Sequence, residues 1–90
     1  MKNYLLSEKN SDAVFAVIKD IDETKLIGNV DLMNKVGQAI DDEFCYEERC
    51  KLIHDSIHKV KETIYMEFRC INDEEEEEIR EVELNMVAIY

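Results

Sequence analysis

The sequence has 90 residues, of which 22 are acidic and 11 are basic, so its formal net charge is −11. Folding of a chain this short hides only about 60–65% of the unfolded surface, which excludes a second domain and a deep enclosed cofactor cleft. We therefore expect a single domain over residues 1–90. The charge disfavours binding to nucleic acid or to an anionic membrane and favours a basic partner, while 46% hydrophobic residues predicts a folded chain.

The N-terminus and the cysteines bear on the compartment. The first apolar run, residues 4–6, is too short for the core of a signal peptide, and no later segment approaches the roughly 18 apolar residues of a membrane span. The three cysteines cannot all pair within one chain. We therefore expect a cytoplasmic protein with reduced thiols.

The first half of the chain predicts one strand and one helix. Residues 13–21 are rich in β-branched and aromatic side chains, which favours a strand, and residues 25–27 predict a short return strand. Asn29 is a good helix N-cap, and apolar side chains then recur at helical spacing, which predicts a helix over residues 30–43. These apolar residues are Val30, Met33, Gly37, Ile40 and Phe44.

A second helix is predicted over residues 46–61, because apolar residues there follow a 4-3-4-3 spacing. They are Tyr46, Cys50, Ile53, Ile57 and Val60. Two glutamates at the N-terminal end and two lysines at the C-terminal end agree with the helix dipole. The junction between the two helices carries no Pro or Gly, so the sequence leaves open whether they are continuous; we expect a break.

From residue 62 the apolar period changes to two, which is typical of half-buried strands. Apolar residues alternate over residues 64–70 and again over residues 82–88, with a short acidic connection between them. The two segments predict an antiparallel hairpin. The expected fold is α+β, a small antiparallel sheet of three to four strands with two helices packed on one face, in the order β-(β)-α-α-β-β.

The cysteines and histidines cluster as Cys45, Cys50, His54 and His58. On the predicted helix the last three are successive i, i+4 neighbours, a spacing that can hold Zn²⁺. The favoured interpretation places the cysteines in the core and the histidines at the surface, so we assign no metal ligand and no cofactor. Neither a nucleophile loop nor a phosphate-binding loop is present in the sequence, which predicts a protein that is not an enzyme.

The densest charge lies between residues 73 and 83, where eight acids accompany one base, Arg80. A second acidic cluster comprises Asp41, Asp42, Glu43, Glu47 and Glu48. Alternate side chains of a strand stand about 6.6–6.8 Å apart on one face, so the end of the run predicts a row of negative charges. The predicted partner-binding residues are Asp73, Glu74, Glu75, Glu76, Glu77, Glu78, Glu81 and Glu83.

Such a row of charges can take the place of a nucleic-acid backbone in a channel lined with Arg and Lys, with fast and salt-sensitive association. In its small size and acidity the chain resembles phage-encoded nucleic-acid mimics, including anti-restriction and anti-CRISPR proteins; the likeness is one of composition and assigns no residue. We therefore predict an inhibitor or regulator of a basic, nucleic-acid-binding protein, with Tyr65 and Tyr90 as anchors at the rim.

Other interpretations stay open at this point. The glutamate run could serve only solubility and the protection of a strand edge. Ile71, Val87, Ile89 and Tyr90 lie on strand faces that are otherwise polar, which favours a self-associating regulatory module with a homodimer interface. A Cys/His zinc-binding module is the third option.

Overall fold

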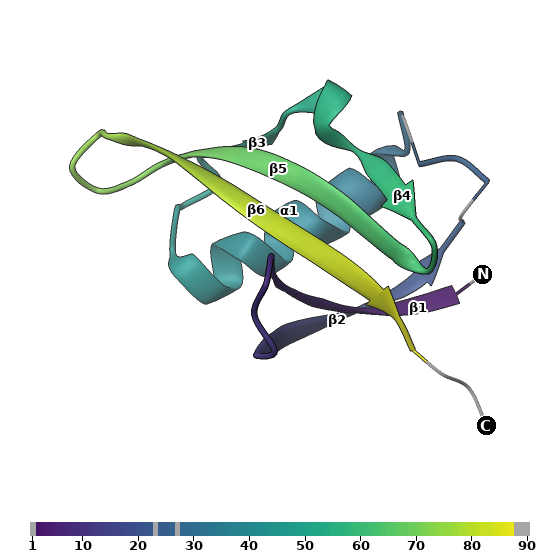
Figure 1. Cartoon of the computed structure of the whole chain (residues 1–90). Coiled ribbons are helices and arrows are strands. Elements are labelled where there is room, and N and C mark those ends of the chain that lie inside the picture. The colour runs from purple at the N-terminus through teal and green to yellow at the C-terminus, as the bar shows by residue number, and fades with distance from the viewer. Residues whose placement is uncertain (1, 23, 27, 88–90) are drawn as a thin grey trace.

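Alternating apolar residues build a curled antiparallel sheet of six strands in the computed structural model, which describes residues 2–22, 24–26 and 28–87. The strands are β1 (Lys2–Glu8), β2 (Val14–Ile21), β3 (Cys50–Leu52), β4 (His58–Val60), β5 (Thr63–Ile71) and β6 (Glu77–Met86). Their order across the sheet is β2-β1-β6-β5-β3, and β4 pairs with β5 as well (Figure 1).

The inner face of the sheet supplies most of the hydrophobic core. Alternate residues of the three central strands are almost fully buried, as the period of two requires. They are Tyr4 and Leu6 of β1, Ile64, Met66, Phe68 and Cys70 of β5, and Val82 and Leu84 of β6. The predicted hairpin is confirmed as β5 and β6, which pair along their length from Thr63 to Ile71, and the predicted first strand is confirmed as β2.

One α-helix, α1 (Val30–Phe44), covers the inner face (Figure 1). It begins at Asn29, whose side-chain oxygen accepts a hydrogen bond from the Leu32 amide at 3.0 Å. It ends at Cys45, which adopts a left-handed backbone with φ 59° and donates its amide hydrogen to the Asp41 carbonyl. Its buried stripe is Leu32, Val36 and Ile40; of the predicted stripe only Ile40 is fully buried, and Val30 is 64% exposed. α1 contacts both β2 and β3, at opposite ends of the strand order, because the sheet curls around it.

The expectation of two helices on a sheet of three to four strands is wrong. Residues 46–61 form β3, a single 3-10 turn, η1 (His54–Ser56), and β4. The backbone is left-handed at Cys45, Glu47 and Glu48, which a continuing α-helix cannot accommodate. Of the five residues in the predicted stripe, Tyr46 and Ile57 are in the core, Cys50 and Ile53 are half-buried, and Val60 is 52% exposed. Leu52, which the predicted spacing did not include, is also in the core.

The two short strands give β5 hydrogen-bonding partners on the edge that β6 does not occupy. Between them, the Ser56 hydroxyl accepts a hydrogen bond from the Glu67 amide at 2.9 Å, so a side chain replaces the missing strand there. β1 was not predicted. Lys25 and Leu26 are not in a strand, and Ile27 and Ala88 lie outside the described residues. No helix in the described part of the chain is long and apolar enough to cross a membrane.

Candidate protein-binding surface

The predicted acidic run forms the tip of the β5–β6 hairpin, which projects from one end of the molecule (Figure 1). Residues 72–76 make the turn, and Ile71 pairs with Glu77 where the strands close. Asp73, Glu74, Glu75, Glu76 and Glu77 are all exposed. The tip therefore presents five adjacent carboxylates to solvent.

Asn72 organises this turn. Its side-chain oxygen accepts hydrogen bonds from the backbone amides of Glu74 and Glu76, each at 2.9 Å, and its own amide donates to the Glu76 carbonyl at 3.0 Å. Its side-chain nitrogen donates to a carboxylate oxygen of Glu78. Asn72 is a turn-forming residue whose side chain bonds its own backbone, and it holds the charged tip in one conformation.

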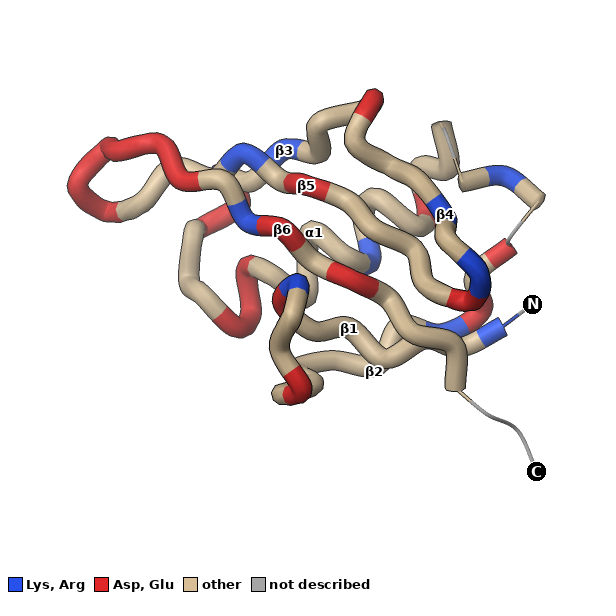
Figure 2. Tube along the Cα trace, viewed as in Figure 1, with Lys and Arg blue, Asp and Glu red and all other residues tan. Residues whose placement is uncertain are grey.

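The second acidic cluster, Asp41 to Glu48, lies beside the root of this hairpin, although it is about 30 residues away in the sequence (Figure 2). Tyr46 donates a hydrogen bond to Glu78, and Arg49 pairs with Asp73 at 3.1 Å. We call residues 41–49 and 69–80 together the acidic end. It contains eleven acids and three arginines, so it carries −8 of the net charge of −11.

The three arginines of the acidic end are the only arginines of the chain, and each pairs with an acid. Arg80 is the most enclosed of them. Its guanidinium lies 4.1 Å from the centre of the Phe44 ring, donates to the Tyr46 hydroxyl at 2.7 Å and approaches Glu8 at 3.2 Å and Glu78 at 3.6 Å. This cation therefore joins β6, β1 and the segment after α1.

Hydrogen bonds and burial around Arg80 shift the pKa values of Glu78 and Tyr46. The hydrogen bond from the Tyr46 hydroxyl, followed by that from Asn72, lowers the pKa of Glu78. Burial, together with the neighbouring Glu78 carboxylate, raises the pKa of Tyr46 to about 12. Glu78 is thus an ionised group held by three partners, and its role in the acidic end is structural.

The strand part of the acidic run does not form the single row that the sequence predicts. Glu78 points to the inner face, and Ile79 separates Glu77 from Glu81 on the outer face. Glu81 and Glu83 do share that outer face, and Glu81 stands directly opposite Glu67 of β5 (Figure 2). Glu67 was not predicted, because the strand register depends on the length of the turn.

The ion pairs separate the acids that are engaged within the chain from those that are not. Glu77 pairs with Arg69 at 2.6 Å, and Glu81 pairs loosely with Lys9 at 3.8 Å. Among the described residues, six exposed glutamates of the acidic end have no ion-pair partner: Glu43, Glu47, Glu48, Glu74, Glu75 and Glu76. These six are the groups most available to a basic partner.

The cysteines and histidines do not share one helix, as the zinc alternative required. Cys45 caps α1, Cys50 begins β3, His54 is in η1 and His58 begins β4, where its ring stacks on Tyr65. No group of three or more His, Cys, Asp or Glu side chains in the described residues is arranged to hold a metal ion. Tyr65 is half-buried, and Tyr90 lies outside the described residues.

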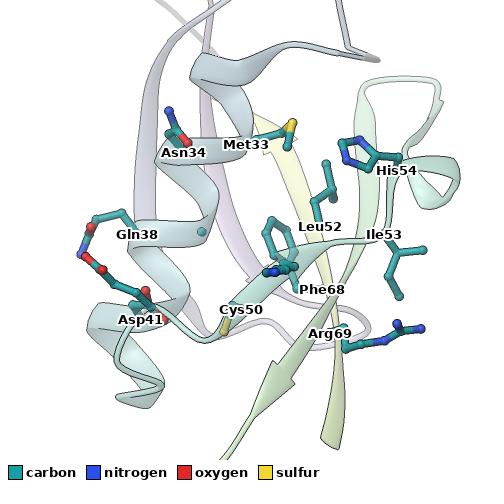
Figure 3. A pocket seen from close by; sticks show the side chains of 13 residues that line it. Met33, Asn34, Gln38, Asp41, Cys50, Leu52, Ile53, His54, Phe68 and Arg69 are labelled. Carbon is teal, nitrogen blue, oxygen red and sulfur yellow. The ribbon is translucent and has the colours of Figure 1, made fainter.

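Two open grooves flank α1. The first, of about 620 Å³, lies between α1 and β3; Figure 3 shows Gln38 and Asp41 of the helix on one side and Cys50 and Leu52 of the strand on the other. The second, of about 690 Å³, lies between α1 and the edge strand β2.

Comparison with known proteins yields no relative: no family model, no curated protein and no solved structure matches the chain.

Proposed function

We propose that this chain binds the basic surface of a nucleic-acid-binding protein through its acidic end, and that binding inhibits or regulates that partner. The observation that carries the proposal is the meeting of two acidic segments, distant in the sequence, at one end of the fold. A charge of −8 on residues 41–49 and 69–80 gives a strong local field, which speeds encounter with a basic partner.

Order at the tip supports the proposal. A flexible glutamate run would serve solubility equally well, but its conformational entropy would be lost on binding. Asn72 fixes the turn, and the Tyr46–Glu78 and Arg49–Asp73 contacts fix the neighbouring segment. Because the backbone that carries these acids is held in place before the partner arrives, less backbone ordering entropy opposes association.

The direct test reverses charge at the tip and, in a matched control, elsewhere. The tip variant carries Glu74→Lys, Glu75→Lys and Glu76→Lys. The control carries Asp12→Lys, Asp55→Lys and Glu62→Lys, three exposed acids outside the acidic end. Both variants change the net charge by the same amount, and neither touches Glu78.

The partner is obtained by affinity capture at low salt and release at high salt, then purified, and its affinity for each variant is measured in competition with labelled duplex DNA. Three reversed contacts of about 0.5–1 kcal/mol each predict that the tip variant binds at least about tenfold more weakly. The control should stay within about twofold of the natural chain. Equal losses in both variants, or none in the tip variant, would show that the acidic end is not the binding surface.

A homodimer is the second candidate, and the edge strand β2 favours it. Val14 and Val17 are 47% and 51% exposed there, beside the α1–β2 groove. The homodimer candidate predicts a solution mass of twice 10.6 kDa. Val17→Lys, which places a charge in that interface, should then return the mass to that of the monomer. The acidic-end proposal expects a monomer, since each chain carries a net charge of −11.

A further inference from the structure

Two of the three cysteines face each other across neighbouring strands. Cys50 of β3 is the direct register partner of Cys70 of β5. The hydrogen bonds on either side run from the Ile71 amide to the Arg49 carbonyl and from the Ile53 amide to the Glu67 carbonyl. The hydrogen-bonded positions along β3 and its two flanking residues are thus 49, 51 and 53, which makes Cys50–Cys70 a non-hydrogen-bonded pair.

This kind of pair has the spacing of a disulfide. Directly opposed residues at non-hydrogen-bonded positions of antiparallel strands have Cα atoms about 4.5 Å apart and side chains that approach closely. Disulfides typically join cysteines whose Cα atoms are about 4.4–6.8 Å apart. The backbone therefore needs little movement to bring the two sulfurs into bonding distance.

The three thiols differ in burial, and this difference decides which of them an oxidant can reach first. Cys70 is fully buried, Cys50 is half-buried and lines the α1–β3 groove opposite Asp41 (Figure 3), and Cys45 is exposed. Burial, followed by the neighbouring Cys70 thiol and the Asp41 carboxylate, raises the pKa of Cys50. Burial also raises the pKa of Cys70. Cys50 is thus the one member of the pair that a small oxidant in the groove can reach.

We propose that Cys50 and Cys70 form a reversible cross-strand disulfide when the chain meets a low-molecular-weight disulfide such as oxidised glutathione. The Cys50 thiolate attacks one sulfur of the oxidant, the S–S bond of the oxidant breaks, and one thiolate leaves and takes up a proton. The Cys70 thiolate then attacks the Cys50 sulfur of the mixed disulfide and displaces the second thiol. Two protein thiols are oxidised, and one disulfide is reduced to two thiols.

The bond would close a loop that contains β3, η1 and β4 and would fasten β3 to β5. Its position links it to the acidic end, because Arg49 precedes Cys50 and Glu78 stands opposite Cys70 on β6. The segment that carries Glu47 and Glu48 would then be anchored covalently to the root of the acidic hairpin. In a reducing compartment the pair stays a dithiol, so the bond reports oxidation.

The experiment uses the full chain with Cys45→Ser, which removes the exposed thiol. The unfolded protein is refolded in a buffer of reduced and oxidised glutathione, in which both thiols are accessible until folding, so slow attack on the buried groups does not limit the outcome. We measure free thiols, intact mass and peptide linkage. The expected product has no free thiol, has lost two hydrogen atoms, carries no glutathione and links residue 50 to residue 70.

Thermal unfolding gives the second measurement. The closed loop predicts a melting temperature higher by on the order of 10 °C, reversed by dithiothreitol. The variant with Cys45→Ser and Cys70→Ser is the control; it has one thiol left and should show no such rise. If the Cys45→Ser chain refolds with both thiols free, or with glutathione attached and no link between residues 50 and 70, the proposal is wrong.

Discussion

Replacement of Tyr46 by Phe tests the cluster that holds the acidic end together. The change removes only the hydroxyl, which donates to Glu78 and accepts from Arg80, and it leaves the ring in contact with Phe44. Hydrogen bonds to charged groups contribute about 1.5–3 kcal/mol each. Glu78 and Arg80 are 38% and 28% exposed and lie 3.6 Å apart, so water and their mutual ion pair recover part of this energy.

We therefore expect Tyr46→Phe to lower the free energy of unfolding by about 1–3 kcal/mol at neutral pH, which lowers the melting temperature of a chain this size by roughly 4–8 °C per kcal/mol. The pH dependence gives a sharper signature. Folding raises the pKa of Tyr46 from 10.0 to about 12. The folded state therefore holds the proton more tightly, and this stabilisation is present below pH 10 and is lost as pH rises through 12.

Half of this stabilisation, about 1.4 kcal/mol, should be gone at about pH 11. Urea unfolding, followed by circular dichroism, is measured for the natural chain and for Tyr46→Phe at about pH 8 and about pH 11. The difference in the free energy of unfolding between the two proteins is compared at the two pH values, because the effects of other titrating groups cancel in this difference. Tyr65→Phe is the control, because the Tyr65 hydroxyl makes no hydrogen bond among the described residues. A difference that stays constant between the two pH values would refute the reasoning.

Further predictions concern acid stability and the two glycines. Glu78→Gln should flatten the acid denaturation curve below about pH 4.5, since the lowered pKa of Glu78 contributes stability that is present above this value and lost as pH falls through the folded one. Gly37→Ala should raise the free energy of unfolding by about 0.5–1 kcal/mol, because its Cβ would meet only Phe68, at an ordinary 3.7 Å. Gly28→Ala should lower it by about 1 kcal/mol, since φ is +77° there. Urea unfolding measures both glycine variants.

The sequence predicted those helices and strands whose formation depends on the pattern of their own residues. Asn29 and the apolar stripe that follows it specify α1, and the period of two specifies β5 and β6. The segment 46–61 was predicted wrongly because its strands have three residues each, too few to show alternation, and η1 between them restores a helical spacing. What decides that segment is the unpaired edge of β5, a partner that lies outside the segment itself.

The candidate site divides in the same way. Composition alone predicted the exposed acids of the tip, Glu74 to Glu76, because a run of like charges must be solvated. It could not predict that Glu78 turns inward or that Glu67 joins Glu81, since both depend on the strand register. The contacts of Tyr46 with Glu78 and Arg80 depend on how the chain turns back after α1, and no local sequence pattern predicts that turn.

Charge at the acidic end implies opposite effects of salt on folding and on binding. Eleven acids face three arginines there, so like charges repel one another in the free protein, and added salt should screen this repulsion and raise the melting temperature. The same screening weakens attraction to a basic partner, so affinity should fall over the range of salt concentration in which stability rises.

The variant with Glu74→Lys, Glu75→Lys and Glu76→Lys should lose the salt dependence of both its melting temperature and its affinity. The control with Asp12→Lys, Asp55→Lys and Glu62→Lys should keep most of each. If salt raises the melting temperatures of the two variants equally, the repulsion is not concentrated at the tip, and the acidic end loses its electrostatic basis as a binding surface.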